Sequence, residues 1–287
     1  MISIIICSQN PAYLQALTQN IEESVGISYE LLAIDNKDSK KGIASVYNEA
    51  AAKAHYNILC FIHEDIRIHT IDWGHVLVNT LSDENIGLVG ISGAVFKSKY
   101  PATWSACESN LYRTHSIQHF KNISLPVETN INPLNEKKTL VAVIDGVFMA
   151  TRKNVFTKFS FDEKLLSGFH GYDIDYSIQV SQKYNMVVSF EILLEHFSEG
   201  NFNTQWLNSS IAVHKKWKKK LPSKTLLMSK STIRFNDYLA INSLLNVALK
   251  HNGNKRLVLL NYFRSVIAFW EYNGFKFSKS VFQYLKK

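Results

Sequence analysis

Three polar residues, His63, Glu64 and Asp65, follow directly after an apolar run at residues 57–62. The run has the length and composition of a strand that is buried on both faces of a sheet. In open α/β sheets ligands bind beyond the carboxyl ends of the strands, so these side chains should meet a ligand. Carboxylate oxygens are ligands that Mn²⁺ and Mg²⁺ accept readily. The segment therefore predicts a divalent cation site, at which a nucleotide diphosphate would fit.

Other expected strands also end on polar residues. A single acid after a strand means little, because turns favour Asp and Asn. Acids after three strands that share one sheet edge predict a common ligand site instead. The residues are Ser8 after the run 2–7, Asp35 after 29–34, Asp65 after 57–62 and Asp145 after 140–144.

A second group with chemical potential is the segment from Gly168 to Asp175, in which two glycines precede Asp173. Residues 174–184 have helical periodicity, so Asp173 should lie at a helix start. A carboxylate there, after a flexible turn, could accept a proton from a bound hydroxyl group. The alternative is structural, with Asp173 capping the helix and Asp175 lying in its first turn.

The surrounding elements alternate between strands and helices. Strands are expected at 2–7, 29–34 and 57–62, and helices at 13–25 and 44–55. This β-α-β-α-β order predicts an α/β fold with a mostly parallel sheet flanked by helices. Further strands are expected at 86–95, 140–144, 148–152 and 186–190, and further helices at 73–81 and 206–217.

Two later stretches differ from this pattern. Residues 97–139 show little periodicity and predict long functional loops, and residues 194–200 also predict a loop. Residues 223–287 predict helices only. We therefore expect an α/β domain at 1–221 and a basic helical extension at 222–287.

The charge distribution supports this division. Residues 211–287 contain 16 Lys and Arg but only two acids, whereas the whole chain has a formal net charge of +8. Three scattered cysteines indicate reduced, buried thiols and a cytoplasmic protein. Neither a secretory signal nor an apolar run of about 20 residues is visible.

The order of several short motifs resembles a known family. The chain is similar to family 2 glycosyltransferases with the GT-A (Rossmann-like) fold, and within them to a bacterial glycosyltransferase-like branch. The resemblance covers about residues 2–200 and leaves the basic extension uncovered. It rests on segments 4–10, 32–36, 42–50, 60–65, 145–146, 171–175 and 195–196.

The resemblance implies roles at the nucleotide and cation end of the site. Asp65 would bind a Mn²⁺ or Mg²⁺ ion that bridges the two phosphates, and His196 would be a second metal ligand. His63 and Glu64 stand in the family's Asp-x-Asp motif, where His63 departs from the pattern and would contact the ribose. The other residues implied to bind the nucleotide-sugar are Ser8, Asn10, Asp35 (towards uracil and ribose), Asp145 and Gly146.

It also implies roles at the acceptor end. Asp173 aligns with the catalytic base, and Tyr172 replaces the glutamate that usually precedes it. Apart from the resemblance, three residues are expected to contact the acceptor: His170, which flanks the glycine turn, Tyr172, and Trp104, on whose ring a sugar could stack. For Trp104, packing in the core is the alternative.

The implied activity is inverting, metal-dependent sugar transfer from a nucleotide donor, UDP in particular, to a hydroxyl group. The acceptor would be a glycan or a lipid-linked glycan in bacterial surface polysaccharide or glycolipid synthesis. One rival is a sugar-phosphate nucleotidyltransferase, although Ser8 to Pro11 is not a glycine-rich phosphate loop. A second rival, favoured by the replacements at His63 and Tyr172, is a degenerate fold that serves as a binding or scaffold module.

The segment 215–220 places Trp217 among five lysines. Such a segment could bind an anionic membrane surface, which would put the protein at the inner face of the plasma membrane. The alternative is a solvated helical face. Nucleic acid is not an expected partner, because the first 210 residues are acidic overall and no nucleic-acid-binding motif is present.

Overall fold

The computed structural model describes residues 1–39, 41–251 and 253–286. A seven-stranded mixed sheet has the order β10-β13-β5-β12-β3-β1-β2. Strand β1 is parallel to β2 and β3, whereas β12 is antiparallel to β3 and β5. The expected mostly parallel sheet is therefore confirmed around the N-terminal strands. The strands are β1 (Ile2–Ser8), β2 (Tyr29–Asp35), β3 (Ile58–Ile62), β5 (Ile86–Gly90), β10 (Lys138–Leu140), β12 (Phe148–Arg152) and β13 (Asn185–Ser189).

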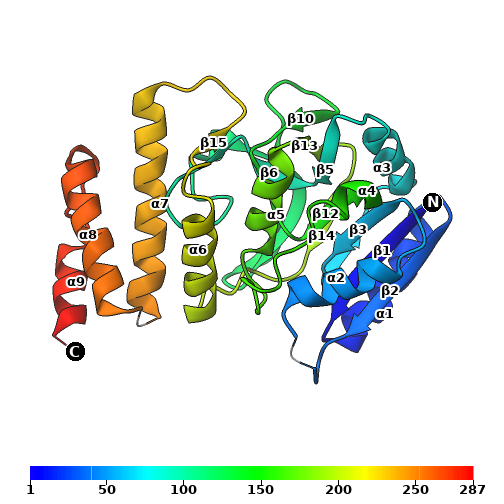
Figure 1. Ribbon diagram of the computed structural model, residues 1–287, viewed down its shortest axis with the longest axis horizontal. Helices are drawn as coiled ribbons and strands as arrows, with labels where there is room; N and C mark the ends of the chain where they lie inside the picture. Colours follow the sequence, from blue (N-terminus) through cyan, green and yellow to red (C-terminus); the bar gives the residue numbers. More distant parts are fainter. Residues whose placement is uncertain (40, 252, 287) are drawn as a thin grey trace.

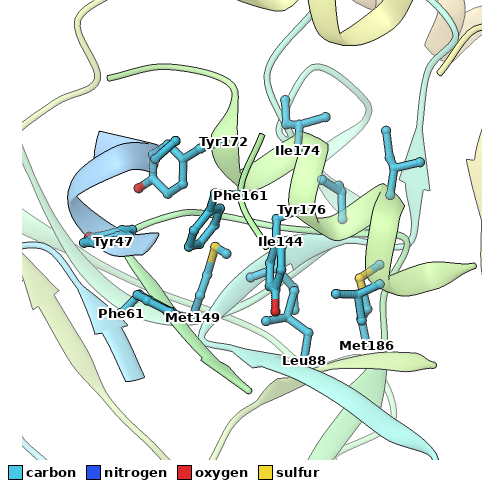
Figure 2. Close-up of a cluster of buried hydrophobic side chains, with 14 of the residues drawn as sticks. Tyr47, Phe61, Leu88, Ile144, Met149, Phe161, Tyr172, Ile174, Tyr176 and Met186 are labelled. Carbon is cyan, nitrogen blue, oxygen red and sulfur yellow. The ribbon is translucent and has the colours of Figure 1, made fainter. Parts of the chain in front are cut away.

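Helices cover both faces of this sheet because successive side chains of a strand point to opposite faces. In β1, Ile4 and Ile6 pack on one side with α1 (Pro11–Ser24) and α3 (Trp73–Leu81). Ile5 packs on the other side with α2 (Ile43–Lys53) and α5 (Tyr172–Ser181). This second core is rich in aromatic rings, and Figure 2 shows Tyr172 at its edge beside Tyr47 and Phe161.

A second, smaller sheet continues from the first and has the order β11-β6-β8-β14-β4, with β9 paired to β8. Its strands β8 and β9 form a hairpin within residues 97–139, so the prediction of long loops there was wrong. These strands lack an alternating apolar face, since β9 is largely exposed and β8 is only partly buried. The strands are β4 (Ile66–Ile68), β6 (Ser92–Ala94), β8 (Tyr112–Phe120), β9 (Ile123–Ile131), β11 (Val143–Ile144) and β14 (Leu194–His196).

The small sheet corrects three further expectations. Residues 86–95 form β5 and β6 in different sheets, and the segment 140–144 is divided between β10 and β11 in the same way. Residues 194–196 form strand β14 and not a loop, because they pair with both β8 and β4. A short helix α4 (Lys153–Phe156) and a 3₁₀ turn η1 (Ser109–Leu111) complete this half of the chain.

The C-terminal part is mainly helical. Helices α6 (Thr204–Lys216), α7 (Lys230–Lys250) and α8 (Lys255–Phe269) stand side by side and lead away from the sheets, followed by η2 (Trp270–Tyr272) and α9 (Ser278–Leu285) (Figure 1). Trp206 and Leu207 of α6 pack with Leu244 of α7 and Tyr262 of α8. The expected all-helical extension needs one correction, because β15 (Ser223–Lys224) pairs with β7 (Phe96–Lys97). The domain boundary at 221/222 stays a prediction.

Two predictions from composition can be compared directly with the structure. Cys7, Cys60 and Cys107 are buried free thiols, as expected. Among the described residues, no helix combines the length and the apolar character needed to cross a lipid bilayer.

Candidate metal centre and substrate cleft

Strand pairing brings His63, Asp65 and His196 together. His63 follows β3, Asp65 immediately precedes β4, and His196 ends β14. In the antiparallel pair of β14 and β4, His196 is opposite Ile66, and Phe197 N–H donates to the Asp65 carbonyl at 3.0 Å. Residues about 130 positions apart in the sequence thereby meet at the end of two short strands.

The three side chains form a compact cluster in which each offers one ligand atom, and these atoms all lie within 4.8 Å of one another. His63 Nδ1 is 3.9 Å from Asp65 Oδ1, and His196 Nε2 is 3.6 Å from the same oxygen. Two imidazole nitrogens and a carboxylate suit Mn²⁺, which accepts both nitrogen and oxygen ligands. His63, which the resemblance assigned to the ribose, thus lies with the two expected metal ligands.

Neighbouring groups fix the orientation of both histidines. The Tyr172 hydroxyl donates to the Gly146 carbonyl at 3.0 Å and lies 2.8 Å from His63 Nε2, so this nitrogen is the one that carries the proton. His196 Nδ1 lies 3.1 Å from Gln118 Oε1, an oxygen that can only accept a hydrogen bond, so the proton of this ring is on Nδ1. Each ring therefore directs an unprotonated nitrogen towards Asp65, and a histidine needs such a nitrogen to bind a metal.

The protonation states also fit a bound cation. Burial alone would raise the pKa of Asp65, but His196 and His63, when they are protonated on the nitrogens that face it, lower it well below its usual value. Burial lowers the pKa of His63. Within the described residues, His196 Nε2 is buried and has no hydrogen-bond partner. A cation would satisfy that nitrogen, so the donor set fits a metal.

A cavity of about 360 Å³ adjoins the cluster. It is lined by eight of the residues that the sequence singled out, and it places Asp173 in the same cleft as two of the three candidate metal ligands. The eight are His63, Trp104, Asp145, Gly146, His170, Tyr172, Asp173 and His196.

Asp173 is the second residue of α5, and Gly171 precedes the helix with a φ of 83°, which favours glycine. Burial and the nearby Asp145 carboxylate raise the pKa of Asp173 to about 7, against the opposing effect of backbone N–H groups. A carboxyl group with such a pKa is suited to accept a proton near neutral pH. Asp175 differs in role, since it is fully buried and binds Lys216 Nζ at 2.8 Å and Trp217 Nε1 at 2.7 Å.

The contacts of Asp175 also bear on the basic segment 215–220. Lys216 and Trp217 join α6 to α5, and Lys216 Nζ is also 2.9 Å from Asp162. The segment is therefore not a free amphipathic surface, and its tryptophan points at a buried carboxylate. The exposed neighbours Lys218 and Lys219 remain as a solvated face.

Glu64 and its partners lie outside the residues that line this cleft. The Glu64 carboxylate accepts from the Ser8 hydroxyl at 2.7 Å and from the N–H groups of Gln9 and Asn10 at 3.0 Å. Asn10 in turn caps α1 by accepting from Ala12 N–H. Glu64 thus holds the loop between β1 and α1, and its oxygens are already engaged.

Two other predicted residues have clear local roles. Asp35 ends β2 opposite Ser8, is exposed, and accepts from Lys37 N–H at 3.0 Å. Asp145 accepts from the indole N–H of Trp104 and, at 2.9 Å, from Val147 N–H. Trp104 also packs edge-on against Tyr112, with ring centroids 5.4 Å apart.

Sequence reasoning missed Gln118. It lies on β8, orients His196, and donates to the Ser198 carbonyl at 2.8 Å, so it also holds the loop after β14. Its segment had no periodicity that would have revealed a strand. Gly146 was expected to bind donor, whereas its carbonyl accepts from Tyr172 and a Cβ at this position would lie 2.3 Å from that hydroxyl.

Comparisons with known proteins identify the family and the fold of the chain. A family model described as "Glycosyltransferase like family" matches residues 3–225. A search of curated proteins finds no match.

Among solved structures, the crystal structure of GalNAc-T7 with UDP, GalNAc and Mn²⁺ is similar, with a TM-score of 0.52 and 10% identity over 83% of this chain and 54% of that chain. The chain thus spans about half the length of GalNAc-T7. The mannosyltransferase PcManGT from Pyrobaculum calidifontis, in complex with GDP-Man and Mn²⁺, has a TM-score of 0.52 and 13% identity over 99% of this chain and 84% of that chain. Identities this low show the fold alone. The expected GT-A fold is confirmed, and the chain belongs to the Glycosyltransferase like family.

Proposed function

We propose that the protein is an inverting, cation-dependent glycosyltransferase that moves a sugar from a nucleotide donor, UDP in particular, to a hydroxyl group. One observation carries this proposal. A single cleft is lined by His63 and His196, which form a cluster with Asp65, and by Asp173, whose pKa is about 7. Family membership adds support, and it disfavours the nucleotidyltransferase alternative.

In the proposed reaction Asp173 accepts the proton of the acceptor hydroxyl, whose oxygen attacks the anomeric carbon as the bond to the diphosphate breaks. Attack opposite the leaving group inverts the anomeric configuration without a covalent sugar–enzyme intermediate. A bound Mn²⁺ or Mg²⁺ would offset the negative charge that develops on the leaving diphosphate. His63, Asp65 and His196 would hold this cation, with Tyr172 and Gln118 keeping the two rings in place.

The nucleotide would lie over the ends of β1 and β2, where Ser8 and Asp35 are opposite each other. Asp35 is exposed and free to accept a further hydrogen bond from the base or ribose. We propose that Glu64 shapes this pocket indirectly, through the loop that includes Ser8 and Asn10.

The test is a panel of UDP- and GDP-sugars, each measured with and without Mn²⁺ by thermal shift and then by release of the nucleotide. We expect at least one UDP-sugar to raise the melting temperature only when Mn²⁺ is present, and to be hydrolysed or transferred. If only GDP-sugars stabilise the protein, the donor nucleotide is GDP and not UDP. Binding of a donor without turnover would favour the degenerate binding module, and no binding at all would contradict the proposal.

Replacing Tyr172 with phenylalanine should weaken Mn²⁺ binding by about 10–100-fold, since the hydroxyl orients a ligand histidine. The ring packs in an aromatic core, and the substitution keeps its volume, so the fold should survive (Figure 2). Mn²⁺ affinity can be followed by calorimetry. The matched control is Tyr284→Phe, which removes a hydroxyl group from α9, and unchanged affinity in Tyr172→Phe would exclude an orienting role.

The proposed acceptor is a glycan or a lipid-linked glycan of a bacterial surface polysaccharide or glycolipid pathway, and we propose peripheral association with an anionic membrane. Helix α8 supports this, because its outward face and the residue after it expose Leu260, Phe263, Ile267 and Trp270. Residues 255–286 contain six Lys and Arg and one acid, so the segment that carries this apolar face has a net positive charge, which complements anionic lipid.

Replacing both Ile267 and Trp270 with aspartate should abolish sedimentation with phosphatidylglycerol vesicles, because the apolar area that would be buried is lost and the charge attraction is reduced. Both side chains are exposed, at 76% and 67%, so the fold should tolerate the change. The control is Leu227→Asp, an exposed leucine outside α8. Equal sedimentation of the double variant and the wild type would refute membrane docking by α8.

A further inference from the structure

A second and larger cavity, of about 800 Å³, continues from the cleft. The two cavities share Trp104, Asp145 and His196, so the second opens directly from the candidate metal centre. Its walls are the hairpin of β8 and β9 on one side and the C-terminal end of α7 on the other. Ligand pockets are commonly about 300–1,000 Å³, and this cavity lies in the upper part of that range, so it has room for a ligand larger than a single sugar.

Alternate residues of β8 form one wall, because side chains two positions apart share a face of a strand. Thr114 and Ser116 lie in the middle of this wall, and their hydroxyls form a chain with Ser92. Ser92 Oγ is 2.6 Å from Thr114 Oγ1, which is 3.0 Å from Ser116 Oγ. Tyr112 precedes them on the same face. Uncharged hydroxyls beside aromatic faces are suited to bind a sugar chain, whose rings present both hydroxyls and apolar faces.

Charge changes along the groove. The acids among its lining residues, Asp145 and Glu199, are shared with the first cavity and therefore lie towards the metal centre. The lysines, Lys121 after β8 and Lys250 at the end of α7, line the second cavity without lining the first. The part of the groove that the first cavity does not share thus offers positive charge to a ligand.

We propose that this groove binds the acceptor as an oligosaccharide of several sugars, with an anionic group, carboxylate or phosphate, held by Lys121 and Lys250. This inference rests on the proposed function, because it assigns the acceptor to the same cleft. The reacting hydroxyl lies at the shared end, towards Asp173. Further sugars lie along Thr114 and Ser116, and the anionic group lies at Lys121 and Lys250.

The test is calorimetric titration of the full chain with four probes, without nucleotide or metal. These are maltotetraose, maltotetraose 1-phosphate, a hyaluronan tetrasaccharide and glucose 1-phosphate. We expect one of the two anionic tetrasaccharides to bind at least about tenfold more tightly than maltotetraose, which corresponds to about 1.4 kcal/mol, and more tightly than glucose 1-phosphate. A preference for the phosphate points to a phosphorylated or lipid-linked acceptor, and one for hyaluronan points to an acidic sugar.

Two variants locate the binding. The double change Lys121→Glu and Lys250→Glu should remove the preference for the anionic probe, while Thr114→Val should weaken all tetrasaccharides alike. The matched control is Lys218→Glu with Lys219→Glu, which alters the net charge equally on the exposed stretch after α6. Equal effects of the two double variants, equal affinity for neutral and anionic tetrasaccharides, or no tetrasaccharide binding would overturn the proposal.

These titrations contain no donor, so their failure is separable from that of the proposed function. Donor turnover without tetrasaccharide binding would contradict the proposed acceptor groove and leave the proposed glycosyltransferase activity supported. Tetrasaccharide binding without donor binding would support the groove as a carbohydrate-binding site but contradict the proposed glycosyltransferase activity.

Discussion

Replacing Asp65 with alanine is expected to abolish Mn²⁺-dependent binding of UDP and all turnover of the donor. Asp65 faces a bare nitrogen from each of two histidines, and its carboxylate supplies the negative charge of the cluster. The loss should exceed the about 10–100-fold that follows removal of a residue that merely orients a ligand. Mn²⁺ and UDP affinities should be measured by calorimetry, each with and without the other.

Glu64→Gln is the matched control, since it neutralises the adjacent carboxylate, which faces the loop between β1 and α1. This variant should keep its Mn²⁺ affinity and lose some UDP affinity as the loop loosens. If Asp65→Ala binds UDP as tightly as the wild type in the presence of Mn²⁺, the cation site lies elsewhere.

The sequence predicted the candidate metal centre only in part. Asp65 was predicted because it follows a strand-like segment, and both Asp65 and His196 match positions in a known family. A metal-ligand role for His63 was not foreseen, because the resemblance implied a contact with the ribose and because the ring is oriented by a hydrogen bond to Tyr172, 109 positions later in the chain. Sequence spacing carries no information about such a contact.

The hairpin of β8 and β9 was missed for a related reason. Hydrophobic alternation reveals a strand only where one face is buried in a core, whereas β8 turns hydroxyl groups towards a groove. Gln118, which orients His196, was missed because it lies on this strand. In contrast, β1 and β3 are apolar on both faces because helices cover both, and their long apolar runs were readily recognised.

The composition of segment 215–220 suggested a role that its contacts do not support. Five lysines around a tryptophan predicted a free amphipathic surface, but Trp217 donates to the buried Asp175. The exposed apolar face is on α8, whose apolar residues lie on its outward side as well as on its inward side. The sequence therefore predicted the basic character of the extension but did not single out the apolar face on α8.

Replacing Asp173 with asparagine should lower the rate of transfer by about 10²–10⁴-fold, the usual contribution of a general base, while donor and Mn²⁺ affinities are retained. In the wild type, the rate should rise with pH and level off above about 7, because only the ionised carboxylate can accept a proton. The measurements are transfer rate against pH and donor affinity for both proteins. If the variant transfers sugar at the wild-type rate, Asp173 is not the general base.

Stability provides an independent check on the same residue. The pKa of Asp173 is about 7 in the folded protein and near 3.9 in an unfolded chain, so the folded state binds more protons between these values. Folding stability should therefore fall as the pH rises through this window, and the loss should be complete above about 7. An asparagine side chain does not titrate, so the Asp173→Asn variant should melt at a higher temperature than the wild type at pH 8, and the difference should shrink at pH 5. A stability difference that is the same at both pH values would show that Asp173 is ionised throughout, and the pH dependence of transfer would then require another group.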